Sequence, residues 1–256
     1  MISRMALLVS PTAQAQVAAA LLRPLHDWTA IRDAEVVVAL GGDGFLLQVL
    51  HAALHARQPR PVFGMNLGSV GFLMNDFSVD DLPGRLTRAR AFALHPLSME
   101  ARTVAGGVIV SPAINEVSLL RETRQAAKLE ISVDGKVRMS ELSCDGVLVA
   151  TPAGSTAYNL SANGPILPLQ ADLLALTAIS PFRPRRWRGA LLPQASIIEF
   201  RILEADKRPV SAVADQLEVR DVASVRITSD RSVTLDLLFD PSYALDDRIF
   251  SEQFDN

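Results

Sequence analysis

The sequence predicts two domains: an α/β, Rossmann-like domain at the N-terminus, then a domain of predominantly antiparallel β-structure. Before Pro96, short aliphatic runs alternate with helix-like segments, which is the βαβ pattern of a parallel sheet. After Pro96, short runs of alternating polarity are separated by turn signals such as Asp134-Gly135, which is typical of antiparallel hairpins. We therefore expect the first domain at residues 1–96 and the second at residues 97–239.

Three strand and helix pairs are expected in the first domain. The strands are Met5 to Val9, Val36 to Leu40 and Val62 to Met65, and the helices are Gln14 to Leu25, Phe45 to Leu54 and Val79 to Ala89. The run Val36 to Leu40 contains no polar residue, so we expect this strand to be buried on both faces of a parallel sheet.

The second domain shows the two-residue periodicity of half-buried strands. Its expected strands include Leu129 to Val133, Lys136 to Ser140, Ile197 to Leu203, Val219 to Ile227 and Val233 to Leu238. No repeat, low-complexity tract or long charged linker separates the two domains. We therefore expect them to pack together, with a ligand cleft at their junction.

Composition limits the functional classes. The chain has 256 residues, 49% of them hydrophobic, and a formal net charge of −3, so there is no electrostatic reason to expect nucleic acid or an anionic membrane as the main partner. Cys144 is the only cysteine, which excludes an intrachain disulfide and favours a reducing compartment. Because Met1 to Val9 is too short for a signal peptide or a membrane span, we expect a cytoplasmic protein.

The segment Gly41-Gly42-Asp43-Gly44 is the first candidate for chemistry. It follows the buried strand and precedes helix-periodic residues, so its backbone N–H groups are expected at a helix N-terminus, where phosphate is favoured. Asp43 is then an anion beside bound phosphate. The alternative is a hairpin turn at Asp-Gly, which the continuous apolar run before the glycines disfavours.

Asn66 to Leu73 also follows a strand, and its glycines are expected to lie beside the Asp43 loop, because loops at the carboxyl ends of parallel strands line one crevice. A structural loop without ligand contact is an equally good interpretation. The pair Asn115-Glu116 lies in an apolar run and could bind base and ribose edges, or form a surface turn.

The longest candidate segment, Asp145 to Ser161, reads as a strand, a turn of small residues and a helix start. Its hydroxyls, glycine and aromatic ring suit the base and sugar of a nucleotide. Alternatively, Ser155 or Thr156 is a helix N-cap and Tyr158 a core aromatic. Arg183 to Arg188 holds the densest positive charge. It is either a solvated turn or a phosphate contact for a nucleotide, within the chain or across a subunit interface.

In order and spacing, these segments together resemble the NAD kinases, which phosphorylate the adenosine 2′-hydroxyl of NAD with ATP. Gly41 to Gly44 matches the GGDG motif of that family, and Asn66 to Leu73 matches its NLGxxGFL-like segment. Asn115-Glu116 matches its NE pair, and Asp145 to Ser161 matches its DGxxxSTPTGSTAYxxS segment. The resemblance covers the chain from its first third to its middle.

The resemblance implies that Asp43 is the general base, with Gly44 beside the phosphate, and that a divalent cation, Mg²⁺, bridges the phosphates of ATP; no protein residue is assigned as a metal ligand. The implied contacts to the dinucleotide are Asn115, Glu116, Asp145, Ala153, Thr156, Ala157, Tyr158, Asn159, Leu160 and Ser161. Gly68 and Gly71 would leave room for the second nucleotide. The resemblance also implies a homodimer or homotetramer and a C-terminal tail, residues 240–256, that packs on the first domain.

The chain departs from the family pattern at several positions. Ala150 and Ala153 stand where the family often has Ser and Thr, and Ser143 stands where many members carry arginine. A later Asp-Gly of the family appears as Asp215-Gln216, so these two residues are weaker candidates for the site.

Two alternative functions share parts of this pattern. A diacylglycerol or sphingosine kinase would share the GGDG motif, but Phe45 stands where those enzymes usually have threonine, and there is no basic amphipathic helix for a membrane. The second alternative is a non-catalytic regulator that binds a dinucleotide. The presence of Asp43, the implied general base, disfavours it.

Overall fold

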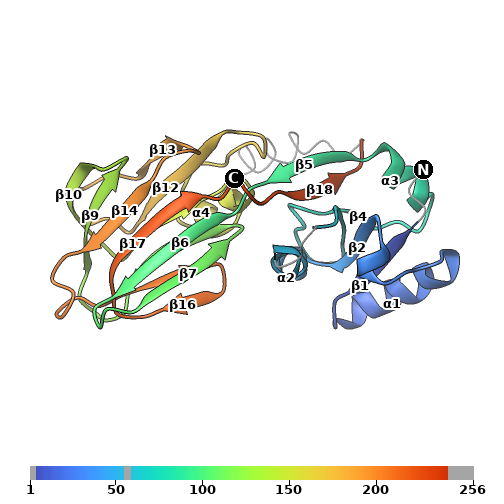
Figure 1. The fold of residues 1–256 in the computed structure, drawn as a ribbon, viewed down its shortest axis with the longest axis horizontal. Helices are drawn as coiled ribbons and strands as arrows, with labels where there is room; N and C mark the ends of the chain where they lie inside the picture. Colours follow the sequence, from blue (N-terminus) through green and yellow to red (C-terminus); the bar gives the residue numbers. More distant parts are fainter. Residues whose placement is uncertain (1–3, 55–58, 242–256) are drawn as a thin grey trace. The chain divides into compact units, whose positions relative to one another are not determined.

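The computed structural model describes residues 4–54 and 59–241, and it divides the chain into two compact units (Figure 1). Unit 1 consists of Met1–Leu94 and Val233–Asn256, and unit 2 of His95–Ser232. None of the described helices is both long enough and apolar enough to cross a bilayer.

Unit 1 is built on a six-stranded sheet with the order β1-β2-β3-β18-β5, and β4 pairs with β3. The strands are β1 (Met5–Val9), β2 (Val36–Gly41), β3 (Val62–Asn66), β4 (Asn75–Asp76), β5 (Arg90–Leu94) and β18 (Leu235–Phe239). Only the pairing of β5 with β18 is antiparallel among them. Every residue of β2 is buried, which confirms that this apolar run is covered on both faces.

Three α-helices accompany this sheet: α1 (Ala13–Leu22), α2 (Asp43–Leu54) and α3 (Leu82–Arg88). Thr12 caps α1 by accepting the N–H of Ala15. This helix ends three residues earlier than expected, because Pro24 has no N–H to continue it, and the chain tightens into the 3₁₀ turn η1 (Arg23–Leu25). A second such turn, η2 (Ile31–Asp33), precedes β2.

The structure differs from the expected domain boundary at the C-terminal end of the second domain. The sequence predicts the strand Val233 to Leu238 within the β-rich domain of residues 97–239, but β18 lies between β3 and β5 in the sheet of unit 1. Alternating polarity reveals a strand but not its sheet, because sheet membership depends on distant pairing partners. Of the expected tail at 240–256, residues 242–256 lie outside the described residues.

Buried polar contacts attach the end of β18 to unit 1. Asn75 is fully buried, and its amide donates to the carbonyls of Gly64 and Leu238 at 3.0 and 2.9 Å. The N–H of Asp240 in turn donates to Asn75 Oδ1 at 2.8 Å. The carboxylate of Asp240 pairs with Arg85 at 2.6 Å, and both side chains are only 13% exposed.

We expect Asn75→Ala to lower the free energy of unfolding by about 2–4 kcal/mol, because it leaves two buried carbonyls and one N–H without partners. Urea denaturation would measure the loss, with Gln125→Ala at an exposed turn position as the control. A loss no larger than in the control would contradict this role of Asn75.

Unit 2 consists of two six-stranded antiparallel sheets. The β14 sheet has the order β10-β9-β14-β17-β6-β7, and the β11 sheet has the order β13-β12-β11-β8-β15-β16. The strands of the β14 sheet are β6 (Leu97–Thr103), β7 (Val108–Ala113), β9 (Ala127–Val133), β10 (Lys136–Cys144), β14 (Ile198–Ile202) and β17 (Val222–Ser229). Those of the β11 sheet are β8 (Glu116–Arg121), β11 (Gly146–Ala150), β12 (Leu173–Ile179), β13 (Gly189–Pro193), β15 (Val210–Ala214) and β16 (Leu217–Val219).

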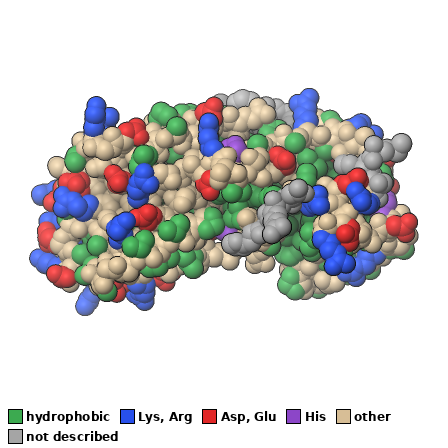
Figure 2. Space-filling view, in the orientation of Figure 1, with side chains coloured by type: hydrophobic (Ala, Val, Ile, Leu, Met, Phe, Trp, Pro, Cys, Tyr) green, Lys and Arg blue, Asp and Glu red, His purple; other side chains and the backbone are tan. Residues whose placement is uncertain are grey.

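The two sheets of unit 2 share one hydrophobic core, to which the β14 sheet contributes Phe200 and Ile227 and the β11 sheet contributes Val147 and Leu176. The expected hairpin at Asp134-Gly135 is present, with both residues at positive φ between β9 and β10. On the face shown in Figure 2, basic and acidic side chains intermingle over unit 2. This face therefore carries no continuous patch of one charge.

Candidate functional site

In unit 1, Asp43 lies where β2 ends and α2 begins. Its carboxylate accepts three consecutive backbone N–H groups from the loop after β3. Gly71 and Phe72 donate to Oδ2 at 2.9 and 3.1 Å, and Leu73 donates to Oδ1 at 3.1 Å. The structure therefore confirms a strand, a glycine loop and a helix here, and it excludes the hairpin.

The Asp43 loop and the loop after β3 lie side by side, as expected. A Cβ added to Gly68 would lie 3.2 Å from the Cα of Gly42, so the two backbones approach closely. Asn66 shapes the second loop by accepting the N–H of Gly68 and donating to the carbonyl of Val70. Gly71 has φ +75°, and a Cβ there would lie 2.3 Å from the Asn66 side chain, so glycine is required.

The backbone at the start of α2 is open to a ligand. Gly44 is exposed, and no atom lies within 4 Å of the Cβ that a larger residue would have there. An anion can therefore approach the first turn of this 12-residue helix, where the helix dipole is positive.

In unit 2, three candidate segments meet at one end of the β11 sheet. Ala150, the last residue of β11, pairs with Glu116, the first residue of β8. Ala214, the last residue of β15, pairs with Val117. The sheet thus brings Asn115-Glu116 together with the loop after Ala150 and with the turn at Asp215-Gln216, whereas Asp145 lies at the opposite end of β11.

Asp215 holds the Asn115-Glu116 pair in place. Its carboxylate accepts the N–H groups of Ile114, Asn115 and Glu116 at 2.6, 3.0 and 3.2 Å. Its backbone has φ +50°, a conformation that aspartate tolerates better than most residues. Asp215 therefore fixes the backbone of a candidate binding pair, a function that its own sequence context did not reveal.

The loop after β11 packs directly against Asn115. The hydroxyl of Thr151 donates to the carbonyl of Ile114 at 2.7 Å and accepts the N–H of Gly154 at 3.1 Å. A Cβ added to Gly154 would lie 2.1 Å from the carbonyl oxygen of Asn115, so glycine is required for this contact. The sequence pattern around Thr151 gives no sign of this role.

Where the sequence predicts the start of a helix, the structure has only two short helical elements. Residues Ala153–Thr156 form a 3₁₀ turn, η3, and Tyr158–Ser161 form α4, and neither element has a side-chain N-cap. The hydroxyl of Ser155 instead donates to the carbonyl of Pro152 and accepts the N–H of Leu167. Ser155 is therefore a buried structural residue.

Asn159, an expected dinucleotide contact, is fully buried. Its amide donates to the carbonyls of Ser155 and Pro165, and Thr177 donates to its Oδ1 at 2.6 Å. The side chain is thus committed to the protein, which makes Asn159 a positioning residue for the loop. Ala153 is only 4% exposed, whereas Thr156, Ala157, Tyr158, Leu160 and Ser161 remain accessible.

Asn115 and Glu116 carry buried acceptors without partners. Among the described residues, neither Oδ1 of Asn115 nor Oε2 of Glu116 has a hydrogen-bond donor. Such atoms are rare in folded proteins because they forgo hydrogen bonds with water. Two of them on adjacent residues suit a ligand that donates hydrogen bonds through hydroxyl or amino groups.

The surroundings of Glu116 disfavour its ionised form. Burial, together with the nearby carboxylate of Asp215, raises the pKa of Glu116 from 4.5 to about 7. Burial also raises the pKa of Tyr158, and the carboxylates of Glu116 and Asp145 raise it further. Tyr158 packs against a small buried cluster that includes Leu148 and Ala150 of β11. Tyr158 is therefore electrostatically coupled to carboxylates from both ends of this strand.

The pKa of Glu116 predicts how stability depends on pH. Between pH 4.5 and pH 7 the folded state holds a proton that the unfolded state has released, so the free energy of unfolding should fall as pH rises. The total change should be about 3 kcal/mol. We expect Glu116→Gln to remove this part of the pH dependence in thermal unfolding from pH 4 to pH 8.

Glu199→Gln, at a half-exposed position on β14, is the matched control and should leave the pH dependence as in the wild type. An unchanged pH profile in Glu116→Gln would contradict the assignment.

Comparison with known proteins gives concordant results. The family model "ATP-NAD kinase C-terminal domain" matches residues 114–233. Two proteins named NAD kinase, from Rhizorhabdus wittichii and Zymomonas mobilis, are 64% and 60% identical to this chain, over 98% of this chain and 98% of their own lengths.

Solved structures show the same fold. The yeast NADH kinase complexed with NADH has a TM-score of 0.80 at 21% identity, covering 98% of this chain and 87% of that one. An NAD kinase from Archaeoglobus fulgidus in complex with ATP has a TM-score of 0.74 at 24% identity, covering 97% and 98%. The identities of 64% and 60% over nearly the full length show that the chain belongs to the NAD kinase family.

Proposed function

We propose that this enzyme transfers the γ-phosphate of ATP to the adenosine 2′-hydroxyl of NAD, giving NADP and ADP, and that Asp43 is the general base. The close relatives named NAD kinase support the reaction. The observation that carries the role of Asp43 is its carboxylate, which three N–H groups orient at the N-terminus of α2.

The hydrogen bonding of Asp43 leaves room for this role. A carboxylate has about four lone-pair positions. Two N–H groups occupy Oδ2, whereas Oδ1 accepts only the N–H of Leu73 among the described residues. The second lone pair of Oδ1 can therefore accept the proton of a substrate hydroxyl, while the other three bonds keep the carboxylate from rotating.

Phosphoryl transfer requires mainly that the reacting groups be positioned and that developing charge be offset. The exposed backbone at Gly44 and the positive end of α2 supply a place for phosphate close to Asp43. We also propose that Gly68 and Gly71 leave room for the second nucleotide.

We propose Mg²⁺ as the divalent cation. The described residues contain no cluster of three or more His, Cys, Asp or Glu side chains that could hold a metal by themselves. Mg²⁺ keeps several waters and binds mainly through substrate phosphates, so it does not require a site made of protein side chains alone. When bound, the ion would neutralise phosphate charge.

In unit 2, the unpartnered acceptors of Asn115 and Glu116 suit the hydroxyl and amino donors of a nucleoside. Tyr158 offers a ring for packing against base or ribose. Asp145 and the accessible residues Thr156, Ala157, Leu160 and Ser161 are proposed as further contacts. Ala153, Asn159 and Asp215 would act by holding this surface in place, and Gln216 is exposed beside it.

The biological setting is proposed from the same resemblance. We propose a homodimer or homotetramer in the cytoplasm, acting on small-molecule substrates, without nucleic acid or membrane as partners. Sedimentation of the purified chain would test the oligomeric state.

We expect Asp43→Asn to lower kcat for NADP formation by about 100- to 10,000-fold, the usual contribution of a general base. Asparagine also places an NH₂ group against one or more N–H donors of the loop, so part of the loss could arise from a displaced loop. Asn66→Ala is the matched control, because it removes two hydrogen bonds within the same loop and leaves the carboxylate intact.

A much larger loss in Asp43→Asn than in Asn66→Ala would support Asp43 as the base, and equal losses would contradict it. No NADP from the wild type with NAD, ATP and Mg²⁺ would overturn the kinase proposal. NAD binding without turnover would then support the regulator, and phosphorylation of diacylglycerol or sphingosine would support the lipid kinase.

A further inference from the structure

The segment between β12 and β13 concentrates unpaired positive charge. Arg183, Arg185, Arg186 and Arg188 lie within it, and all four are exposed. Among the described residues, none of the four has an ion-pair partner, whereas Arg85, Arg121 and Arg201 each contact a carboxylate at 2.6 or 2.7 Å. In a chain with net charge −3, these guanidinium groups are free to bind an anion.

Two of these arginines make cation–π contacts with the same aromatic ring. The Cζ atoms of Arg183 and Arg185 lie 5.6 and 6.0 Å from the ring centroid of Phe182. Phe182 itself is 55% exposed. Cation–π contacts of this kind orient guanidinium groups without neutralising their charge. The pair is thus partly ordered before any ligand arrives.

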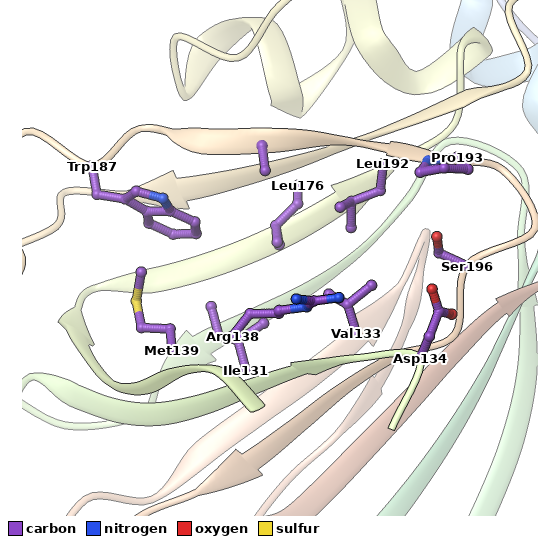
Figure 3. Close-up of a pocket in the computed structure, with 11 residues that line it drawn as sticks. Ile131, Val133, Asp134, Arg138, Met139, Leu176, Trp187, Leu192, Pro193 and Ser196 are labelled. Atoms are coloured by element: carbon purple, nitrogen blue, oxygen red, sulfur yellow. The ribbon is translucent and has the colours of Figure 1, made fainter. Parts of the chain in front are cut away.

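The segment is attached to the core of unit 2 on both sides. At its start, Ser143 at the end of β10 exchanges backbone hydrogen bonds with Arg183: the N–H of Ser143 donates to the Arg183 carbonyl at 2.8 Å, and the Ser143 carbonyl accepts the N–H of Arg183 at 3.1 Å. At its end, Trp187 lies against a cavity of about 390 Å³ and packs on the hydrophobic core (Figure 3).

This attachment places the arginines beside one end of the proposed dinucleotide surface. Ser143 lies two residues before Asp145, and Asp145 immediately precedes β11. The negative charge of Asp145 contributes to the raised pKa of Tyr158. Asn115 and Glu116 lie at the other end of β11, about 17 Å away at 3.3–3.4 Å per residue. A ligand that contacts both ends must be longer than a nucleoside.

We propose that Arg183 and Arg185 bind the diphosphate of the dinucleotide substrate. The inference rests on the proposed function. It adds positively charged side chains that contact phosphate, which the matched motifs do not supply. Guanidinium groups bind phosphate through paired, charge-assisted hydrogen bonds, and a diphosphate offers enough oxygens for two of them. The nucleoside at the Glu116 end would then leave its phosphates near the arginines.

The test compares Arg183→Gln/Arg185→Gln with Arg23→Gln/Arg90→Gln by calorimetry. The second pair changes the net charge equally and removes exposed arginines of unit 1 that have no ion-pair partner among the described residues. The ligands are NAD, ATP and adenosine, which lacks phosphates. For the first pair we expect the Kd for NAD to rise by about 10- to 100-fold, with adenosine and ATP unaffected. The KM for NAD should rise with little change in kcat.

Unchanged NAD affinity in the first pair would overturn the inference, as would an equal loss for adenosine, which would mean that the segment shapes the nucleoside site. A loss confined to ATP would assign the arginines to the phosphoryl donor and would also overturn it. Arg183→Lys/Arg185→Lys should restore part of the NAD affinity, which a misfolded loop could not do. A wild type that does not bind NAD would contradict the proposed function instead.

Discussion

Each unit holds its candidate site with one aspartate that accepts three consecutive backbone N–H groups. Asp43 accepts those of Gly71, Phe72 and Leu73, and Asp215 accepts those of Ile114, Asn115 and Glu116. Backbone N–H groups that are buried without an acceptor are costly. A carboxylate accepts such N–H groups through charge-assisted hydrogen bonds. The backbone geometry at the two candidate sites therefore depends on the side chains of Asp43 and Asp215.

An aspartate that accepts three backbone N–H groups has different consequences at the two sites. Asp215 adds negative charge beside Glu116, so the residue that orders the binding pair also raises the pKa of Glu116. Asp43 is both the residue that orders its loop and the proposed base. The two roles therefore fall on one residue at Asp43. In unit 2 they are divided between Asp215, which orders the backbone, and Glu116, which is the proposed ligand contact.

Sequence patterns were sufficient to predict those parts of the structure that depend only on residues close together in the chain. The strand, glycine loop and helix around Asp43 could be predicted because four residues and their flanking runs carry the information. The placement of the Asn66 loop beside it followed from parallel pairing of β2 and β3. The acceptor of the Asn115-Glu116 backbone could not be predicted, because Asp215 is about 100 residues away and no local pattern identifies a distant hydrogen-bond partner. For the same reason, the sequence pattern predicts the strand at Val233 to Leu238 but not its place in unit 1, and it does not reveal the burial of Asn159.

The geometry of the β11 sheet also limits the ligand that unit 2 can accept. Hydrogen-bond acceptors at Asn115 and Glu116 lie at one end of β11, and Asp145 with the arginine segment lies at the other. The carboxylates of Glu116 and Asp145 both contribute to the raised pKa of Tyr158, after burial, so this ring lies between the two ends. A mononucleotide would satisfy one end and leave the other solvated. A dinucleotide is long enough to reach both ends, so the proposed contacts to NAD require the length of this strand as well as the individual residues.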